Sequence, residues 1–141
     1  MKRWLASALL LGTVLAAAPP AAGQTATESL EREARAAFKA GRFPEAGIKF
    51  QEAASAAAEP RRRGKLELQA ALAQFNGRNG RGTRDALRRA FTADPQLEIV
   101  PEFYSPDFLK VVEEVRSSLR AAAPAIPAPV PDLAELKRVS Q

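Results

Sequence analysis

One spacing constrains this sequence more than any other feature: apolar residues recur at an offset of 37 positions. Two stretches, on either side of a break at Glu59–Gly64, carry small and aromatic side chains at three- and four-residue steps, the period of a helix face. The matching pairs are Ala34 with Ala71, Phe38 with Phe75, Phe50 with Leu87, and Ala53 with Ala90. Such an internal repeat indicates two copies of one helical unit.

The first unit is predicted to be a helical hairpin over residues 28–58. Gly41 follows the first amphipathic stretch, at a place where glycine commonly ends a helix. Pro44 then stands where the next helix begins, because a first-turn N–H has no partner inside the helix. Small residues at Ala46 and Ala53 allow the two helices to approach closely.

The second hairpin is predicted over residues 64–95. We expect "EPRRRG" at Glu59–Gly64 to interrupt the helical pattern and the next helix to start after it. We interpret "NGRNGRG" as a glycine-rich loop between the two helices of this unit. Thr83 is the expected N-cap of the last helix, which Asp94-Pro95 ends.

These marks resemble the tetratricopeptide repeat, whose unit is a helix pair of about 34 residues. The second unit has Thr83 where an alanine is expected, and we assign the three extra residues of the spacing to Glu59–Gly64. The resemblance implies an all-α fold, a fragment of a right-handed α-solenoid that binds its ligands along the inner helix of each pair. The first unit carries the family's marks as Phe38, Gly41, Phe43, Ala46, Phe50 and Ala53, and the second keeps Phe75, Leu87 and Ala90.

A capping helix is predicted over residues 106–120, after an extended link bounded by prolines. Ser105 supplies the N-cap, Pro106 the first position and Asp107 an acid in the first turn. The stretch "DPQLEIVPEFYSPDFLKVVEEVR" is similar to the endings of repeat-containing envelope proteins of bacteria, where a final helix covers the last hairpin. Its apolar stripe is Phe108, Val111, Val112, Val115 and Leu119, and Lys110, Glu113, Glu114 and Arg116 are expected outside.

The N-terminus has the features of a secretory signal peptide over residues 1–23. Lys2 and Arg3 precede a 14-residue apolar stretch, which is shorter than the roughly 20 residues of a membrane-spanning helix. Small residues follow, so we expect cleavage before Gln24 and a soluble chain in the periplasm or outside the cell. An uncleaved membrane anchor is the alternative.

Two short segments follow the helical domain, which we place at residues 24–120. Residues 121–131 contain four prolines in eleven positions, a composition typical of a semi-rigid spacer. The tail 132–141 has Asp132 and Glu135 in capping-box spacing and an apolar residue at every third position. Ten residues are too few for a stable helix alone, so the tail either folds against a partner or frays.

Composition narrows the chemistry that this chain can perform. The sequence has no cysteine and no histidine, which removes thiol and imidazole catalysis, disulfides and the usual zinc sites. Without the signal peptide, which holds two of the 21 basic and none of the 16 acidic residues, the net charge falls from +5 to +3. This mild excess does not indicate a nucleic-acid partner. We predict no enzymatic activity, no cofactor and no metal.

Two surfaces are candidates for binding. The resemblance places the first along the inner helices, where this chain has Glu31 and Arg35 in place of the Lys and Asn of members that bind chaperone tails. The second is arginine-rich and includes Arg61–Arg63 and Arg78–Arg89: Arg84 and Arg88 lie one helical turn apart and could meet an anionic surface. Asp85, however, can pair with Arg88 or Arg89 at helical spacing, which would favour an ordinary solvated face. The predicted groove residues are Arg35, Lys39, Lys65, Leu68, Leu72 and Asn76.

The leading functional prediction is a non-enzymatic adaptor or scaffold for another protein or peptide in a cell-envelope complex. One alternative is a basic surface binder of anionic lipid or polysaccharide in the envelope. Another is a structural component that assembles with copies of itself. Carboxylates beside Tyr104, at Glu102 and Asp107, are interpreted as parts of a helix start rather than as an acid–base pair.

Overall fold

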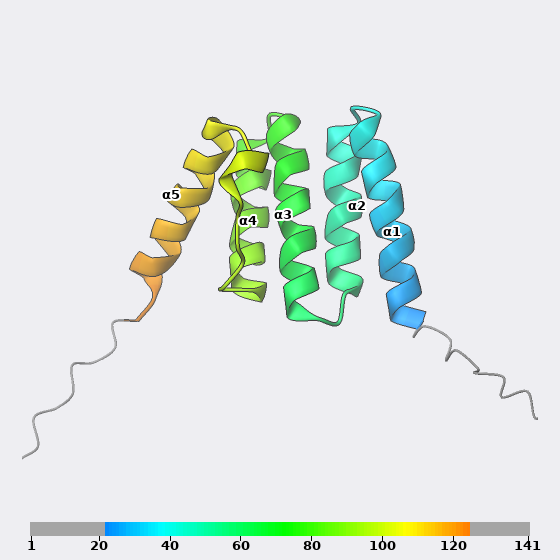
Figure 1. Cartoon of the computed structure of the whole chain (residues 1–141), viewed down its shortest axis with the longest axis horizontal. Coiled ribbons are helices and arrows are strands. Elements are labelled where there is room, and N and C mark those ends of the chain that lie inside the picture. Colours follow the sequence, from blue (N-terminus) through cyan, green and yellow to red (C-terminus); the bar gives the residue numbers. More distant parts are fainter. Residues whose placement is uncertain (1–21, 125–141) are drawn as a thin grey trace, which may run out of the picture.

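The computed structural model describes residues 22–124 of this chain, so most of the predicted signal peptide and the whole tail lie outside the described range. Within that range the chain forms five α-helices, one short 3-10 turn and no strand, which confirms the all-α prediction. The helices lie side by side in chain order (Figure 1). They are α1 (Ala22–Lys39), α2 (Phe43–Ala56), α3 (Pro60–Asn76), α4 (Gly80–Ala93) and α5 (Pro106–Ala122), and the 3-10 turn η1 (Pro101–Phe103) precedes α5.

The 37-residue offset of the sequence is also an offset of the backbone. Helix α4 begins and ends 37 residues after α2, and α3 ends 37 residues after α1. The two turns repeat in the same way, because the Arg42 N–H donates to the Ala37 carbonyl and the Asn79 N–H donates to the Gln74 carbonyl, each at 2.9 Å. The helical repeat expected from the apolar pattern is therefore present in helix boundaries and turn hydrogen bonds alike.

Each hairpin turn reverses through one residue with a left-handed backbone. In the first hairpin this residue is Gly41, with φ of 75°, and in the second it is Arg78, with φ of 60°. Glycine adopts this conformation without steric cost, whereas a residue with a Cβ does not. The second hairpin thus keeps the turn of the first, although arginine at position 78 is unfavourable in a left-handed conformation.

The predicted glycine-rich loop and Thr83 cap are wrong. The turn is only Gly77–Asn79, and α4 begins at Gly80, so that Thr83 lies inside the helix and is fully buried. Asn79 is the N-cap instead, and its Oδ1 accepts the Gly82 N–H at 2.9 Å. The physical reason is that Asn caps as well as Thr, and this register buries the small Thr83 where the first hairpin buries Ala46.

The predicted interruption at Glu59–Gly64 is also wrong, because α3 begins at Pro60 and the connection from α2 is only three residues long. Proline is tolerated at a first helical position, and arginine is a good helix former. Gly64 lies inside α3 because the helix approaches the end of α4 there: a Cβ on Gly64 would lie 2.8 Å from the Asp94 Cβ. Helix α1 likewise starts at Ala22, six residues before the predicted hairpin.

Helix α5 buries Phe108 completely, together with Val112 and Val115. In the first hairpin, Phe38 packs edge-on against Phe43 with ring centroids 5.3 Å apart. The equivalent of Phe43 in the second hairpin is Gly80, and Phe75 packs edge-on against Phe108 of α5 instead, again at 5.3 Å. A ring from α5 therefore makes the contact that the second hairpin lacks.

The start of α5 agrees with the sequence prediction. The Ser105 side chain accepts the Phe108 N–H, Pro106 is the first helical residue and Asp107 lies in the first turn. Arg116, however, is not on the outer side, because its guanidinium lies 4.8 Å from the centroid of the Phe91 ring. The long arginine side chain reaches inward from a half-buried position and covers that ring.

Replacing Gly64 with alanine tests the close approach of α3 to α4. Despite the better helix propensity of alanine, we expect Gly64→Ala to lower the free energy of unfolding by about 1–2 kcal/mol through overpacking. The control is Gly80→Ala, where a Cβ meets only the flexible Arg84 side chain. This variant should be neutral or more stable by about 0.4–1 kcal/mol in urea unfolding. Equal effects at both positions would contradict the packing described.

Replacing Arg78 with glycine tests the strained turn. Removing the Cβ at φ of 60° should raise the free energy of unfolding by about 0.5–1 kcal/mol, because the relieved strain exceeds the entropy that glycine loses on folding. The reverse change in the first hairpin, Gly41→Arg, should lower stability by a similar amount. Thermal unfolding of both variants decides this, and a destabilised Arg78→Gly would show that the turn is not strained.

Candidate functional site

Three separate segments of the chain contribute to a hollow of about 440 Å³. Helices α1 and α3 form two of its sides, and the link between α4 and α5 forms the third. In Figure 1 this link runs beside α3 and α4. The lining residues are Glu31 and Arg35 from α1, Arg62, Lys65, Leu66, Leu68 and Gln69 from α3, and Leu97, Glu98 and Tyr104 from the link.

Three of the six predicted groove residues meet in this hollow, namely Arg35, Lys65 and Leu68. Leu72 is half-buried and packs against the core. The Asn76 side chain donates to the carbonyl of Leu72 and borders a different hollow, beside Asp107. Lys39, the last residue of α1, lines neither hollow.

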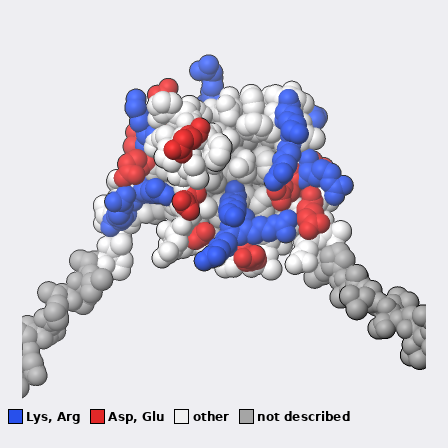
Figure 2. Space-filling view, in the orientation of Figure 1, with Lys and Arg blue, Asp and Glu red and all other residues white. Residues whose placement is uncertain are grey.

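The charges in the hollow are unequally neutralised. Glu31 forms ion pairs with Arg35 and, at 3.3 Å, with Arg62. Lys65 is exposed and has no ion-pair partner within residues 22–124, which makes it the least neutralised cation lining the hollow. Figure 2 shows basic and acidic side chains interleaved on this face rather than one continuous basic patch. The arrangement suits a ligand that brings one or a few carboxylates rather than a polyanion.

The link side of the hollow was not predicted from the sequence. Leu97 is buried, and the Tyr104 ring stacks on Phe108 at a centroid distance of 5.3 Å. Partial burial raises the pKa of the Tyr104 hydroxyl, so this group stays protonated and can donate a hydrogen bond. The signal in the sequence is the pair Pro101 and Pro106, which marks an ordered link but does not show which helices the link crosses.

The arginines of α4 do not form one uniform surface. Arg84 contacts Glu114 of α5 at 3.3 Å, and Arg88 pairs with Asp85 at 3.3 Å, as the sequence spacing suggested. Arg88 also borders a hollow of about 640 Å³ together with Arg63 and Arg89. Three arginines from two helices therefore converge around one depression.

A buried carboxylate, Glu67, also lines this hollow. Glu67 is 4% exposed, and its carboxylate accepts a hydrogen bond from Arg89 at 3.0 Å. Burial raises the pKa of Glu67, while Arg89 and Arg63 act in the opposite direction. The first hairpin has Leu30 at the equivalent position, so the repeat itself does not require a charged residue here.

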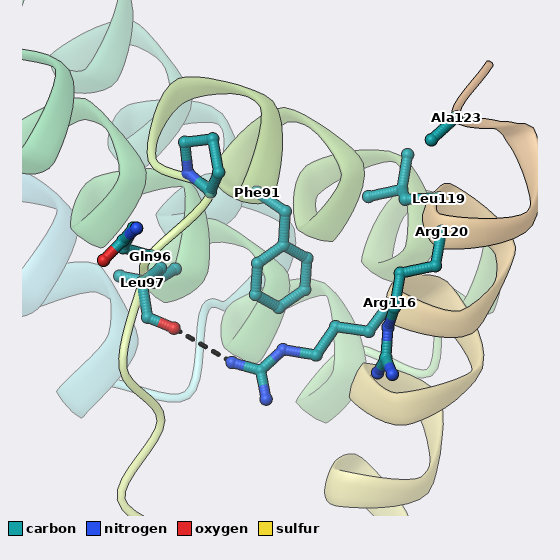
Figure 3. A pocket seen from close by; sticks show the side chains of 8 residues that line it. Phe91, Gln96, Leu97, Arg116, Leu119, Arg120 and Ala123 are labelled. Atoms are coloured by element: carbon teal, nitrogen blue, oxygen red, sulfur yellow. Dashed lines mark hydrogen bonds between the residues drawn. The ribbon is translucent and has the colours of Figure 1, made fainter. Parts of the chain in front are cut away.

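Another hollow, of about 530 Å³, lies between α4 and the second half of α5. Figure 3 shows the Arg116 side chain extending into it from α5, with its guanidinium beside the Phe91 ring. Arg116 also donates to the Leu97 carbonyl at 2.9 Å. This arginine joins α4, the link and α5, and its contacts explain the position without a ligand.

Within the described residues, no cluster of three or more carboxylate, histidine or cysteine side chains could hold a metal ion. Among the same residues, no helix is both long and apolar enough to cross a bilayer. No protein-family model, curated protein or solved structure matches the chain.

Replacing Glu67 with glutamine tests the burial of its charge. Since the folded pKa is raised, the native state takes up a proton before the unfolded state as pH falls, so the penalty for the charge is present above the folded pKa and relieved below it. Glu67→Gln should be more stable than the wild type by about 0.5–1 kcal/mol near pH 8, and the gap should narrow near pH 5. A constant loss of stability at both pH values in urea unfolding would contradict this.

Proposed function

We propose that this chain is a non-enzymatic protein-binding adaptor or scaffold, related in architecture to the tetratricopeptide repeats, that acts in an exported complex of the cell envelope. The observation that carries the proposal is the hollow formed by α1, α3 and the link. It combines cations at Arg35 and Lys65 with apolar Leu68 and the Tyr104 hydroxyl. A hydrophobic floor with a few placed polar groups is the usual composition of a recognition site.

The repetition of the helices supports the same proposal. Two hairpins at a constant offset and a fifth helix give a stiff scaffold of the kind that presents an extended binding face. The exposed positions of the two end helices carry mostly polar and charged side chains, such as Glu28 and Arg32 on α1 and Glu113 and Ser117 on α5. Polar end faces favour a finite unit over growth by stacking of copies. Export is proposed on the sequence of residues 1–23.

The adaptor proposal is tested by reversing charges in the hollow. A tagged chain carrying Arg35→Glu and Lys65→Glu should recover its partner from cells of the source organism about tenfold less well than the wild type. The matched control reverses Arg42 and Lys110, which are exposed and pair only within their own helical segments. Equal recovery by both variants would contradict a role for the hollow.

The convergence of Arg63, Arg88 and Arg89 favours a second candidate, a binder of anionic lipid or polysaccharide. Contacts of this kind are screened within about 10 Å at ordinary ionic strength. The candidate therefore requires binding to phosphatidylglycerol vesicles that falls steeply with salt and is lost on replacing the three arginines with alanine. Binding that is independent of salt, or no binding to such vesicles, would exclude it in favour of the adaptor.

A further inference from the structure

The link presents two apolar side chains to solvent. Val100 is 40% and Phe103 79% exposed. The 3-10 turn between them is held by backbone hydrogen bonds from Phe103 to Val100 and from Tyr104 to Pro101, each 3.2 Å long. Because Tyr104 is stacked on Phe108, the turn is fixed to the body of the domain. An exposed aromatic ring on an ordered turn is typical of a residue that anchors a binding partner.

Two acidic residues lie beside these side chains in the sequence. Glu98 and Glu102 are exposed and have no ion-pair partner within residues 22–124, and Glu98 also lines the hollow with Arg35, Arg62 and Lys65. We call Val100 and Phe103, with these two glutamates, the link surface. An occupant that complements it must bring apolar side chains together with cations. An anionic membrane surface has the wrong charge for this site.

The tail of this chain has the required chemistry. Lys137 and Arg138 are adjacent, with Leu136 and Val139 on either side of them, and the two acids of the tail, Asp132 and Glu135, both precede this cluster. The tail is too short to form a stable helix alone, but a surface that buries its apolar residues and pairs its cations would order it.

The distance also fits. Helix α5 has 17 residues, which at a rise of about 1.5 Å per residue make it about 25 Å long, and it starts two residues after Tyr104. Residues 123–131 are proline-rich, and nine residues at about 3.1 Å each span about 28 Å. A chain that turns back after α5 can therefore return to the level of the link. From these observations we propose that residues 132–141 bind the link surface of the same molecule.

A photoreactive residue at position 103 tests this directly. Phe103 is replaced by p-benzoylphenylalanine in the purified chain, which is irradiated at low protein concentration and mapped by mass spectrometry. The expected product is a crosslink within one molecule between position 103 and residues 132–141. The control is the same replacement at Ile48 of α2, which is 56% exposed and should give no such product. Crosslinks only between two molecules, equal crosslinks from both positions, or none to the tail would overturn the proposal.

A charge exchange supplies the second measurement. Lys137→Glu with Arg138→Glu should lower the yield of the crosslink about fivefold, and adding Glu98→Lys with Glu102→Lys should restore it. All four positions are exposed or lie outside the helical domain, so circular dichroism should show unchanged helix content. An unchanged yield in the first variant, or a failure of the exchange to restore it, would overturn the charge pairing. Glu98 also lines the hollow, but the purified chain is irradiated without any partner protein, so the outcome does not depend on whether the hollow binds one.

Discussion

The arrangement of this molecule depends on the contact between Phe75 and Phe108. The second hairpin has Gly80 where the first has an aromatic ring, and Phe108 of α5 packs against Phe75 at the geometry that Phe43 adopts against Phe38. This contact fixes the start of α5 and, through the stacked Tyr104, the link that precedes it. Since the link forms one side of the hollow, the contact between two phenylalanines determines the shape of the candidate binding site.

The hollow and the link surface follow from the same placement of the link. Its Leu97, Glu98 and Tyr104 complete the hollow with α1 and α3, and its Val100 and Phe103 are exposed to solvent. Arg116 strengthens the arrangement by contacting Phe91 and the Leu97 carbonyl. The packing of α5 on the second hairpin therefore sets the position of the link, and the link contributes residues to both candidate binding surfaces.

Periodicity predicted the helices of this protein well, because the 37-residue offset reflects the packing of one hairpin on the next. It failed at Gly64 and Thr83, where tertiary contacts decide: glycine is needed for a close helix approach, and Thr83 is buried in place of an alanine. Half of the predicted groove residues meet in the hollow. The contribution of Tyr104 to the hollow was not predictable, because single-sequence patterns do not show which segments cross in space.

We propose that the hollow lined by α1, α3 and the link binds another protein. The most direct measurement is photocrosslinking in living cells of the source organism from Gln69, which lines the hollow, in a tagged chain of otherwise native sequence. The account predicts that one other protein is recovered reproducibly and that its crosslinks map to position 69. Recovery of only lipid, polysaccharide or copies of the chain itself would contradict it.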